Sequence, residues 1–274
     1  MQVLKRSFEF YVFGNIHVAV AAYCLTKITF LQFDINNQPL ANFVFFSTML
    51  SYNFIRMFQV DRLNSMTAVW IKAKKKALIV LNSLAFIASI YYLLSFRLVE
   101  IFVLFPLVLA TLFYVFPFKN KVSGLRNVPG LKLFLISITW TGLTLYLPLF
   151  SAEFHNSEHL YASIAQRFLF VLAITIPFDI RDAQFDVPEL NTIPQVLGIN
   201  KAKMMAILAL FITVVLDTRV AYKDSNYFWI NLFIIGLSML MIAFSGPHRR
   251  RFYTAFWIEA LPVLWYLLYL VFIK

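Results

Sequence analysis

Nine apolar segments, separated by short polar stretches, dominate this chain of 274 residues. Each segment can cross the roughly 30 Å of hydrocarbon in a lipid bilayer as a single helix. The pattern therefore predicts an all-α, polytopic membrane protein with nine transmembrane helices, built as one domain over residues 1–274. The predicted spans lie at 10–30, 41–60, 77–95, 98–116, 131–150, 163–179, 203–218, 227–245 and 253–272.

Composition agrees with lipid as the solvent of this chain. Hydrophobic residues make up 61% and charged residues only 14%, with 31 Phe and 13 Tyr, more than a soluble domain of this length needs for its core. The net charge of +11 does not indicate nucleic acid, because the basic residues form short clusters between apolar segments and no continuous stripe. The single cysteine, Cys24, excludes a disulfide framework or a thiolate metal site built from this chain alone.

The distribution of Lys and Arg predicts an orientation. With a cytoplasmic N-terminus, eighteen of the twenty-four basic residues lie on the cytoplasmic side. Such a bias places the N-terminus inside and the C-terminus outside, which requires an odd number of spans and agrees with nine. We expect a multi-pass protein of a bacterial inner membrane, whose candidate active-site loops face the cytoplasm.

Three carboxylates are crowded at the end of the sixth span. Asp179, Asp182 and Asp186 are three of only thirteen acidic residues in the chain. In a helix they lie within about 60° of one another on a single face. Carboxylates so close repel one another unless a cation lies among them, and carboxylate oxygens are ligands that Mg²⁺ accepts. This cluster predicts a Mg²⁺ site.

A second polar group lies at the cytoplasmic end of the second span. Asn53 and Asp61 are about 80° apart around a helix and could face one cavity, with Arg56 between them. Polar residues at membrane depth indicate function, since facing lipid costs a few kcal/mol each. The alternative is that Arg56, Asp61 and Arg62 form an interfacial anchor with a salt bridge.

Taken together, these segments resemble the UbiA superfamily of intramembrane prenyltransferases, which form nine-helix bundles with two Asp-rich motifs on the cytoplasmic side. The acidic cluster matches the second motif of the family, Asp-x-x-Asp-x-x-x-Asp. Further similarity covers most of the chain. The segment 192–198 is close to the family's Thr-Leu-Pro-x-x-Leu-Gly, and Lys201 and Ala202 continue this similarity. The segment 114–119 resembles the family's Tyr-x-x-Pro-x-Lys, which follows the fourth helix.

The first motif of the family departs from its pattern in this chain. The family writes it Asn-Asp-x-x-Asp-x-x-x-Asp, and here Asn53 and Asp61 occupy the outer positions. Phe54 and Met57 stand where two carboxylates are expected. Our hypothesis is that Arg56 contacts the diphosphate directly and replaces part of the lost positive charge, because a guanidinium binds phosphate in a bidentate manner.

The resemblance implies a function and a set of site residues. The function is Mg²⁺-dependent transfer of a prenyl group from a polyprenyl diphosphate to an aromatic or other lipophilic acceptor within the membrane. As implied by the family, Asp179, Asp182 and Asp186 are catalytic and hold Mg²⁺ together with Asp61. The implied diphosphate-binding residues are Asn53, Arg56, Lys119, Arg126 and Arg181.

Two other classes of function stay open from the sequence. The chain could be a non-catalytic UbiA-like protein that binds a polyprenyl diphosphate or another lipid, as Phe54 and Met57 in place of carboxylates suggest. A transporter or channel for cations is the third possibility. Against it, the three clustered carboxylates lie at one interface, whereas transporter sites usually lie near the bilayer midplane.

Overall fold

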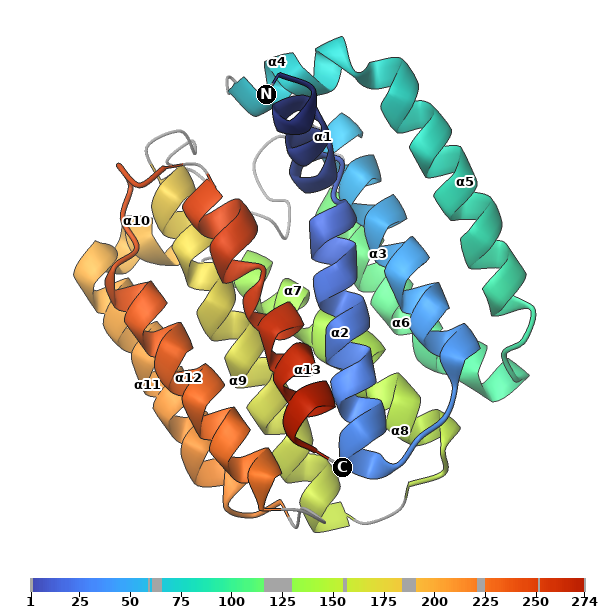
Figure 1. The fold of residues 1–274 in the computed structure, drawn as a ribbon, viewed down its shortest axis with the longest axis vertical. Helices are drawn as coiled ribbons and strands as arrows, with labels where there is room; N and C mark the ends of the chain where they lie inside the picture. The colour runs from blue at the N-terminus through green and yellow to red at the C-terminus, as the bar shows by residue number, and fades with distance from the viewer. Residues whose placement is uncertain are drawn as a thin grey trace.

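The computed structural model describes residues 2–58, 60, 66–115, 130–154, 157–183, 191–220, 225–250 and 252–273. The elements of this part are helices, arranged as an elongated bundle (Figure 1). In chain order they are α1 (Gln2–Phe13), α2 (Ile16–Phe33), α3 (Gln38–Phe58), α4 (Met66–Ala73), α5 (Lys75–Leu93), α6 (Leu98–Val115), α7 (Leu131–Thr141), the π-helix η3 (Gly142–Tyr146), α8 (Leu147–Ser151), α9 (Ser157–Asp182), α10 (Ile193–Leu197), α11 (Ile199–Asp217), α12 (Asn226–Ala243), the π-helix η5 (Tyr253–Ile258) and α13 (Leu261–Phe272).

Seven helical stretches of the described chain are long and apolar enough to cross a membrane. They are Ile16–Phe33, Lys75–Leu93, Leu131–Ser151, His159–Asp182, Ile199–Asp217, Asn226–Ala243 and Tyr253–Phe272. The two other predicted spans correspond to α3 and α6, and α6 contributes a shorter apolar stretch, Leu98–Leu112. The chain is therefore a multi-pass, all-α membrane protein, and the number of nine spans stays a prediction.

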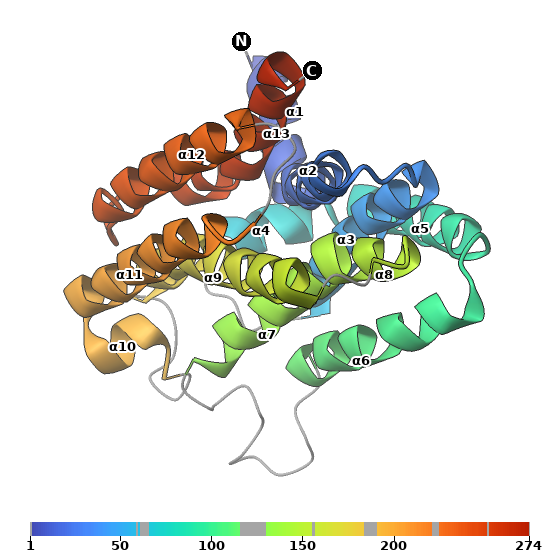
Figure 2. The same ribbon diagram turned by 90° about the horizontal axis from the view of Figure 1, so that it is seen from below.

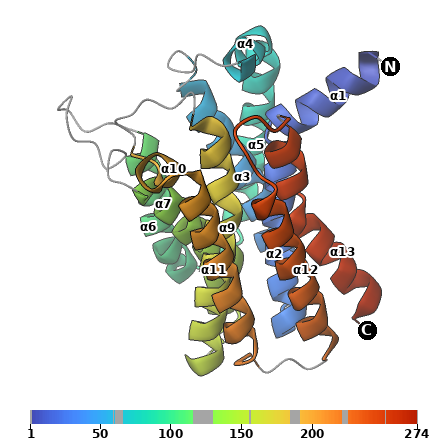
Figure 3. The same ribbon diagram turned by 90° about the vertical axis from the view of Figure 1, so that its left-hand side faces the viewer.

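The first predicted span, 10–30, is divided in the structure. Helix α1 ends at Phe13 and α2 begins at Ile16, because Asn15 takes a left-handed conformation with φ 59°. A Cβ atom on Gly14 would lie 2.6 Å from the carbonyl oxygen of Phe10, so only glycine fits this close turn. The span thus starts at Ile16, and α1 leaves the bundle at an angle (Figure 3).

The long helices run antiparallel, so that one end of the bundle collects residues from many parts of the chain. We call it the motif end: it is where α9 ends at Asp182, where α2, α7 and α11 begin, and where α3 and α12 end. Viewed from below in Figure 2, α2 lies between α13 and α3, and it contacts both. This arrangement places α3, α7, α9 and η5 around one region at the motif end.

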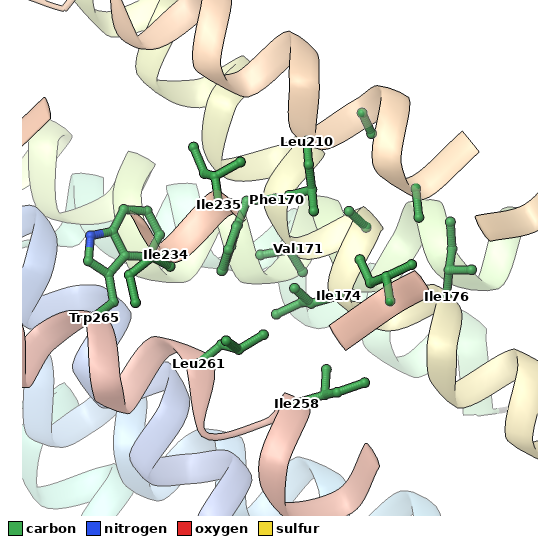
Figure 4. Close-up of a cluster of buried hydrophobic side chains, with 14 of the residues drawn as sticks. Phe170, Val171, Ile174, Ile176, Leu210, Ile234, Ile235, Ile258, Leu261 and Trp265 are labelled. Carbon is green, nitrogen blue, oxygen red and sulfur yellow. The ribbon is translucent and has the colours of Figure 1, made fainter. Parts of the chain in front are cut away.

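The main hydrophobic core lies between α9, α11, α12 and α13 (Figure 4). Phe170 of α9 packs edge-on against Trp265 of α13, with ring centroids 5.0 Å apart, and Leu210 and Ile234 pack around them. Lipid chains are as apolar as these residues, so close van der Waals packing, and not exclusion from water, stabilises the contact. The core fixes the position of α9 and of the acidic residues at its end.

Candidate functional site

Two carboxylates of the predicted acidic cluster lie in the last turn of α9. Asp179 is 1% exposed, and its Oδ1 accepts a hydrogen bond of 2.6 Å from Nζ of Lys132, at the start of α7. Asp182 accepts two hydrogen bonds from the neighbouring Arg181, Nε to Oδ1 at 2.8 Å and Nη2 to Oδ2 at 2.7 Å. Both carboxylates thus face cationic side chains at the motif end.

Arg181 joins α9 to the C-terminal helices. Besides Asp182, its guanidinium donates a hydrogen bond of 2.8 Å to Oγ1 of Thr254 in η5. The guanidinium also lies over the ring of Phe178, 5.3 Å from the centroid. Two contacts with fixed groups and one with an aromatic face hold Arg181 in a defined orientation beside the two carboxylates.

Arg56 reaches the same region from α3, as our hypothesis for it requires. Its neighbours with charged or ionisable groups are Glu259, Arg181, Tyr52 and Asp182. The hydroxyl of Tyr52, one turn earlier, accepts a hydrogen bond of 3.1 Å from the indole of Trp140 in α7. This contact fixes α3 against α7. Arg56 therefore faces a region lined by α7, α9 and the segment after η5.

Glu259 is an ionisable residue of this region that the sequence analysis did not select. It follows η5 and lies near Arg56 and Arg181. A single acidic residue inside the apolar segment 253–272 was the signal that could have identified it, because a carboxyl group is rare at membrane depth. π-Helical turns such as η5 are frequent at functional sites.

Asn53 lies beside the break between α1 and α2, and its role in binding the diphosphate stays a prediction. Its Oδ1 accepts a hydrogen bond of 2.8 Å from Asn15, and its Nδ2 donates one of 2.9 Å to the carbonyl oxygen of Gly14. Asn53 is 1% exposed. These two bonds hold the end of α3 against the break between α1 and α2, and so stabilise that turn.

The two positions that carry carboxylates in the family motif face α5. Phe54 and Met57 line a groove with residues of α5, including Asn82, whose Nδ2 lies 3.5 Å from the sulfur of Met57. Phe54 is 43% exposed. The side of α3 that carries Tyr52 and Arg56, and not the side that carries Phe54 and Met57, is directed toward the site.

Part of the predicted site lies outside the described residues. This holds for two metal-ligand candidates, Asp61 and Asp186, and for two diphosphate-binding candidates, Lys119 and Arg126. Among the residues that are described, no three His, Cys, Asp or Glu side chains are grouped as metal ligands. Of the four predicted metal ligands, Asp179 and Asp182 are the two that lie within the described residues.

The segment 192–198 has a structural role that its residues explain. The amide nitrogen of Thr192 donates a hydrogen bond of 2.9 Å to Oε1 of Gln195, which closes the first turn of α10. Pro194 suits this first turn, and Gly198, with φ 82°, ends α10 and leads into α11. The segment shapes a short turn near the start of α7, where Ile193 lies close to Gly130.

Comparison with known proteins gives a match to solved structures. The structure of a UbiA homologue from Archaeoglobus fulgidus bound to GPP and Mg²⁺ superposes with a TM-score of 0.65 at 14% identity, covering 93% of this chain and 95% of that one. The apo structure of a UbiA homologue from Aeropyrum pernix K1 gives a TM-score of 0.59 at 15% identity, covering 96% and 98%. No protein-family model and no curated protein sequence matches the chain.

At these identities the likeness concerns the fold, and it extends over nearly the full length of all three chains. The resemblance that we drew from the acidic cluster and the flanking segments is confirmed at this level. The chain is a multi-pass membrane protein with the fold of the UbiA homologues.

Proposed function

We propose that this protein is a Mg²⁺-dependent prenyltransferase, which transfers a prenyl group from a polyprenyl diphosphate to an aromatic or other lipophilic acceptor in the membrane. The observation that supports the proposal is that two acidic and two basic side chains lie in one region at the motif end of a UbiA-like bundle. They are Asp179, Asp182, Arg56 and Arg181. The homologue from Archaeoglobus fulgidus, which has this fold, is bound to GPP and Mg²⁺.

The described residues fit Mg²⁺ in the type of their donor atoms. Asp179 and Asp182 provide carboxylate oxygens, which Mg²⁺ prefers, and the ion commonly keeps several waters and substrate phosphates as its other ligands. Two carboxylates are therefore a sufficient protein contribution, to which Asp186 and Asp61 would add. When bound, Mg²⁺ would neutralise the charge that develops on the leaving diphosphate.

The side chains of the chain itself would bind and orient the diphosphate. The guanidinium groups of Arg56 and Arg181 and the ammonium group of Lys132 lie near the two carboxylates and can contact phosphate oxygens. Fixed cations in a region of low dielectric stabilise the diphosphate as the allylic C–O bond breaks and its electron pair leaves with the oxygen. The acceptor then forms a bond with the allylic carbon and releases a proton.

The experiment uses membranes that contain this protein, Mg²⁺, isotope-labelled prenyl diphosphates of several lengths, and a lipid extract of the native host. Mass spectrometry compares the wild type with Asp182→Asn, which should make no prenylated product. The matched control is Asp34→Asn, at the opposite end of the bundle, where asparagine tolerates the left-handed conformation of this residue (φ 57°). This control should retain full activity.

A non-catalytic protein that binds a polyprenyl diphosphate is the second candidate. It is favoured by the ion pairs of Asp179 with Lys132 and of Asp182 with Arg181, and by the position of Phe54 and Met57 beside α5. If the labelled diphosphate binds but neither product nor free pyrophosphate appears with any donor, the transferase proposal fails and this candidate replaces it.

We further propose that the motif end faces the cytoplasm, in a bacterial inner membrane, as the distribution of basic residues predicts. Lys75 is exposed at the start of α5, and Ser95 is exposed beyond its other end. In sealed right-side-out vesicles, a membrane-impermeant maleimide should label Ser95→Cys and spare Lys75→Cys. The native Cys24 is buried and gives little background. The reverse labelling pattern would mean that the orientation is inverted.

A further inference from the structure

Glu259 belongs to neither Asp-rich motif, yet it lies near the basic side chains that surround the motif residues. It is the only acidic residue between positions 225 and 274, within a segment that is otherwise apolar apart from its basic start. An ionisable side chain at membrane depth is costly and is retained where it faces a partner or a polar cavity. The charged groups near Glu259 are Arg56 and Arg181.

The position of Glu259 follows from contacts that join three helices. Arg181 of α9 is fixed to Thr254, and the amide nitrogen of Glu259 donates a hydrogen bond of 3.3 Å to the carbonyl oxygen of the same Thr254. Arg56 approaches from α3 and lies near both Glu259 and Arg181. The carboxylate of Glu259 and two guanidinium groups therefore share one region, within the part of the bundle that the structure describes.

The charges of this region are only partly matched by hydrogen bonds. Asp182 accepts two hydrogen bonds from Arg181 in a bidentate pair. By contrast, the side chains of Arg56 and Glu259 form no hydrogen bond and no ion pair within 4 Å to the described residues. Within the described part of the chain, the five N–H donors of the Arg56 guanidinium thus have no hydrogen-bond acceptor, and they can bind another group.

Two guanidinium groups near each other repel in a region of low dielectric, and they need anions nearby. Asp182 supplies one negative charge beside Arg181, and Glu259 supplies another near Arg56. A diphosphate that binds Arg56 brings several negative charges into the same region, and a fixed carboxylate there repels it. Glu259 and the diphosphate therefore compete for the same positive charge.

We propose that Glu259 is an internal counter-ion of Arg56, which balances this guanidinium in the empty site and sets the affinity for the diphosphate group by competing with it. The inference rests on the proposed binding of a prenyl diphosphate at the motif end. It assigns to Glu259 a role in specificity: only a ligand with enough negative charge, such as a diphosphate with its metal ion, displaces the internal anion.

The test measures binding of inorganic pyrophosphate and of geranyl diphosphate, each with Mg²⁺, to the full-length protein in detergent micelles. Glu259→Gln keeps the shape of the side chain and removes its charge, so both ligands should bind about tenfold more tightly. Arg56→Gln should weaken binding about tenfold. In the double variant, Glu259→Gln should no longer improve binding, because the charge for which it competes is gone.

The control and the alternative outcomes separate this inference from the proposed function. Asp34→Asn removes a distant negative charge and should leave both affinities unchanged, whereas an equal gain there would mean a general effect of net charge. If the wild type binds neither ligand, the proposed function fails. If the wild type binds and Glu259→Gln binds equally well or more weakly, the role as a competing anion is wrong. A lower melting temperature without tighter binding would show that Glu259 only supports the fold.

Discussion

The substitution Asn231→Leu tests how much a buried polar network contributes to the stability of this bundle. Asn231 lies in α12 with 0% exposure, near the end opposite to the motif end. Its Nδ2 donates a hydrogen bond of 2.9 Å to Asp217, and its Oδ1 accepts bonds from the indole of Trp265 at 2.9 Å and from the hydroxyl of Tyr269 at 2.6 Å. Leucine has the same number of side-chain heavy atoms with the same branching, but it forms none of these bonds.

The expected loss follows from the number of bonds and from their value in a membrane. Hydrogen bonds between transmembrane helices contribute on average about 0.6 kcal/mol and at most about 1.7 kcal/mol each in double-mutant cycles. Three lost bonds therefore give a decrease of about 2 to 5 kcal/mol in the free energy of unfolding. We expect a loss of stability in the upper half of this range, because Asp217 is 2% exposed and its carboxylate loses one hydrogen-bond donor.

The assay is unfolding by sodium dodecyl sulfate in mixed micelles, followed by the fluorescence of the tryptophans. The matched control is Ser238→Ala in the same helix: Ser238 is equally buried, but its hydroxyl donates to the carbonyl oxygen of Ile234 within α12. This control should lose less than about 1 kcal/mol. Tyr269→Phe, combined with Asn231→Leu, should give a loss smaller than the sum of the two single losses.

If Asn231→Leu were no less stable than Ser238→Ala, the reasoning would be refuted. It would mean that the bonds of Asn231 are replaced without loss, by water or by other side chains. A strictly additive double variant would contradict only the narrower statement, that Asn231 and Tyr269 stabilise the bundle through their shared bond.

Two further pairs of variants test packing and charge elsewhere in the bundle. Gly142→Ala should lower the free energy of unfolding by about 1 to 2 kcal/mol, because the new Cβ would lie 2.7 Å from both δ-carbons of Leu107. Gly236→Ala, where no atom lies within 4 Å of the new Cβ, should be neutral or stabilising by up to about 1 kcal/mol. In the same unfolding assay, Glu100→Ala should lose about 1 to 3 kcal/mol, because the buried carboxylate of Glu100 accepts three hydrogen bonds. Glu153→Ala should lose less than about 0.5 kcal/mol, because the side chain of Glu153 is 69% exposed. Equal losses within either pair would contradict the structural reason given for it.

The sequence predicted the membrane-spanning character and the UbiA-like fold, because both depend on features that are continuous along the chain. Apolar runs of about 20 residues identify helices without any knowledge of their partners. The break at Gly14 and Asn15 could not be predicted in this way, since both residues lie within an apolar run. It is stabilised by Asn53, which is 38 positions away in the chain.

The candidate site was predicted only where its residues belong to a motif. The spacing of Asp179 and Asp182 places them on one helical face, and the structure has both in the last turn of α9. Lys132 and Glu259 come from other helices, and only the packing of α7 and η5 against α9 brings them to the same region. Hydropathy and residue spacing describe one helix at a time, so they cannot show which charged residues of different helices lie close together in the fold.

The charged side chains of the two ends differ in how completely they are paired within the described residues, and this difference supports a ligand at the motif end. At the opposite end, Arg167 donates three hydrogen bonds to groups of α2 and η3, and Asp217 accepts bonds from Gln166 and Asn231. A network paired in this way stabilises a single arrangement of the helices.

At the motif end, Arg56 and Glu259 have charged neighbours but no hydrogen bond within the described residues. Both side chains are only partly buried. A protein that needed these charges only for stability would be expected to pair them as it pairs Arg167, because an uncompensated charge in a region of low dielectric is costly. Their arrangement is instead the one expected of groups that exchange partners when an anion binds. We therefore expect pyrophosphate to raise the melting temperature of the wild type and, at the same concentration, to raise that of Arg56→Gln by clearly less, whereas Arg167→Met should be less stable with or without it.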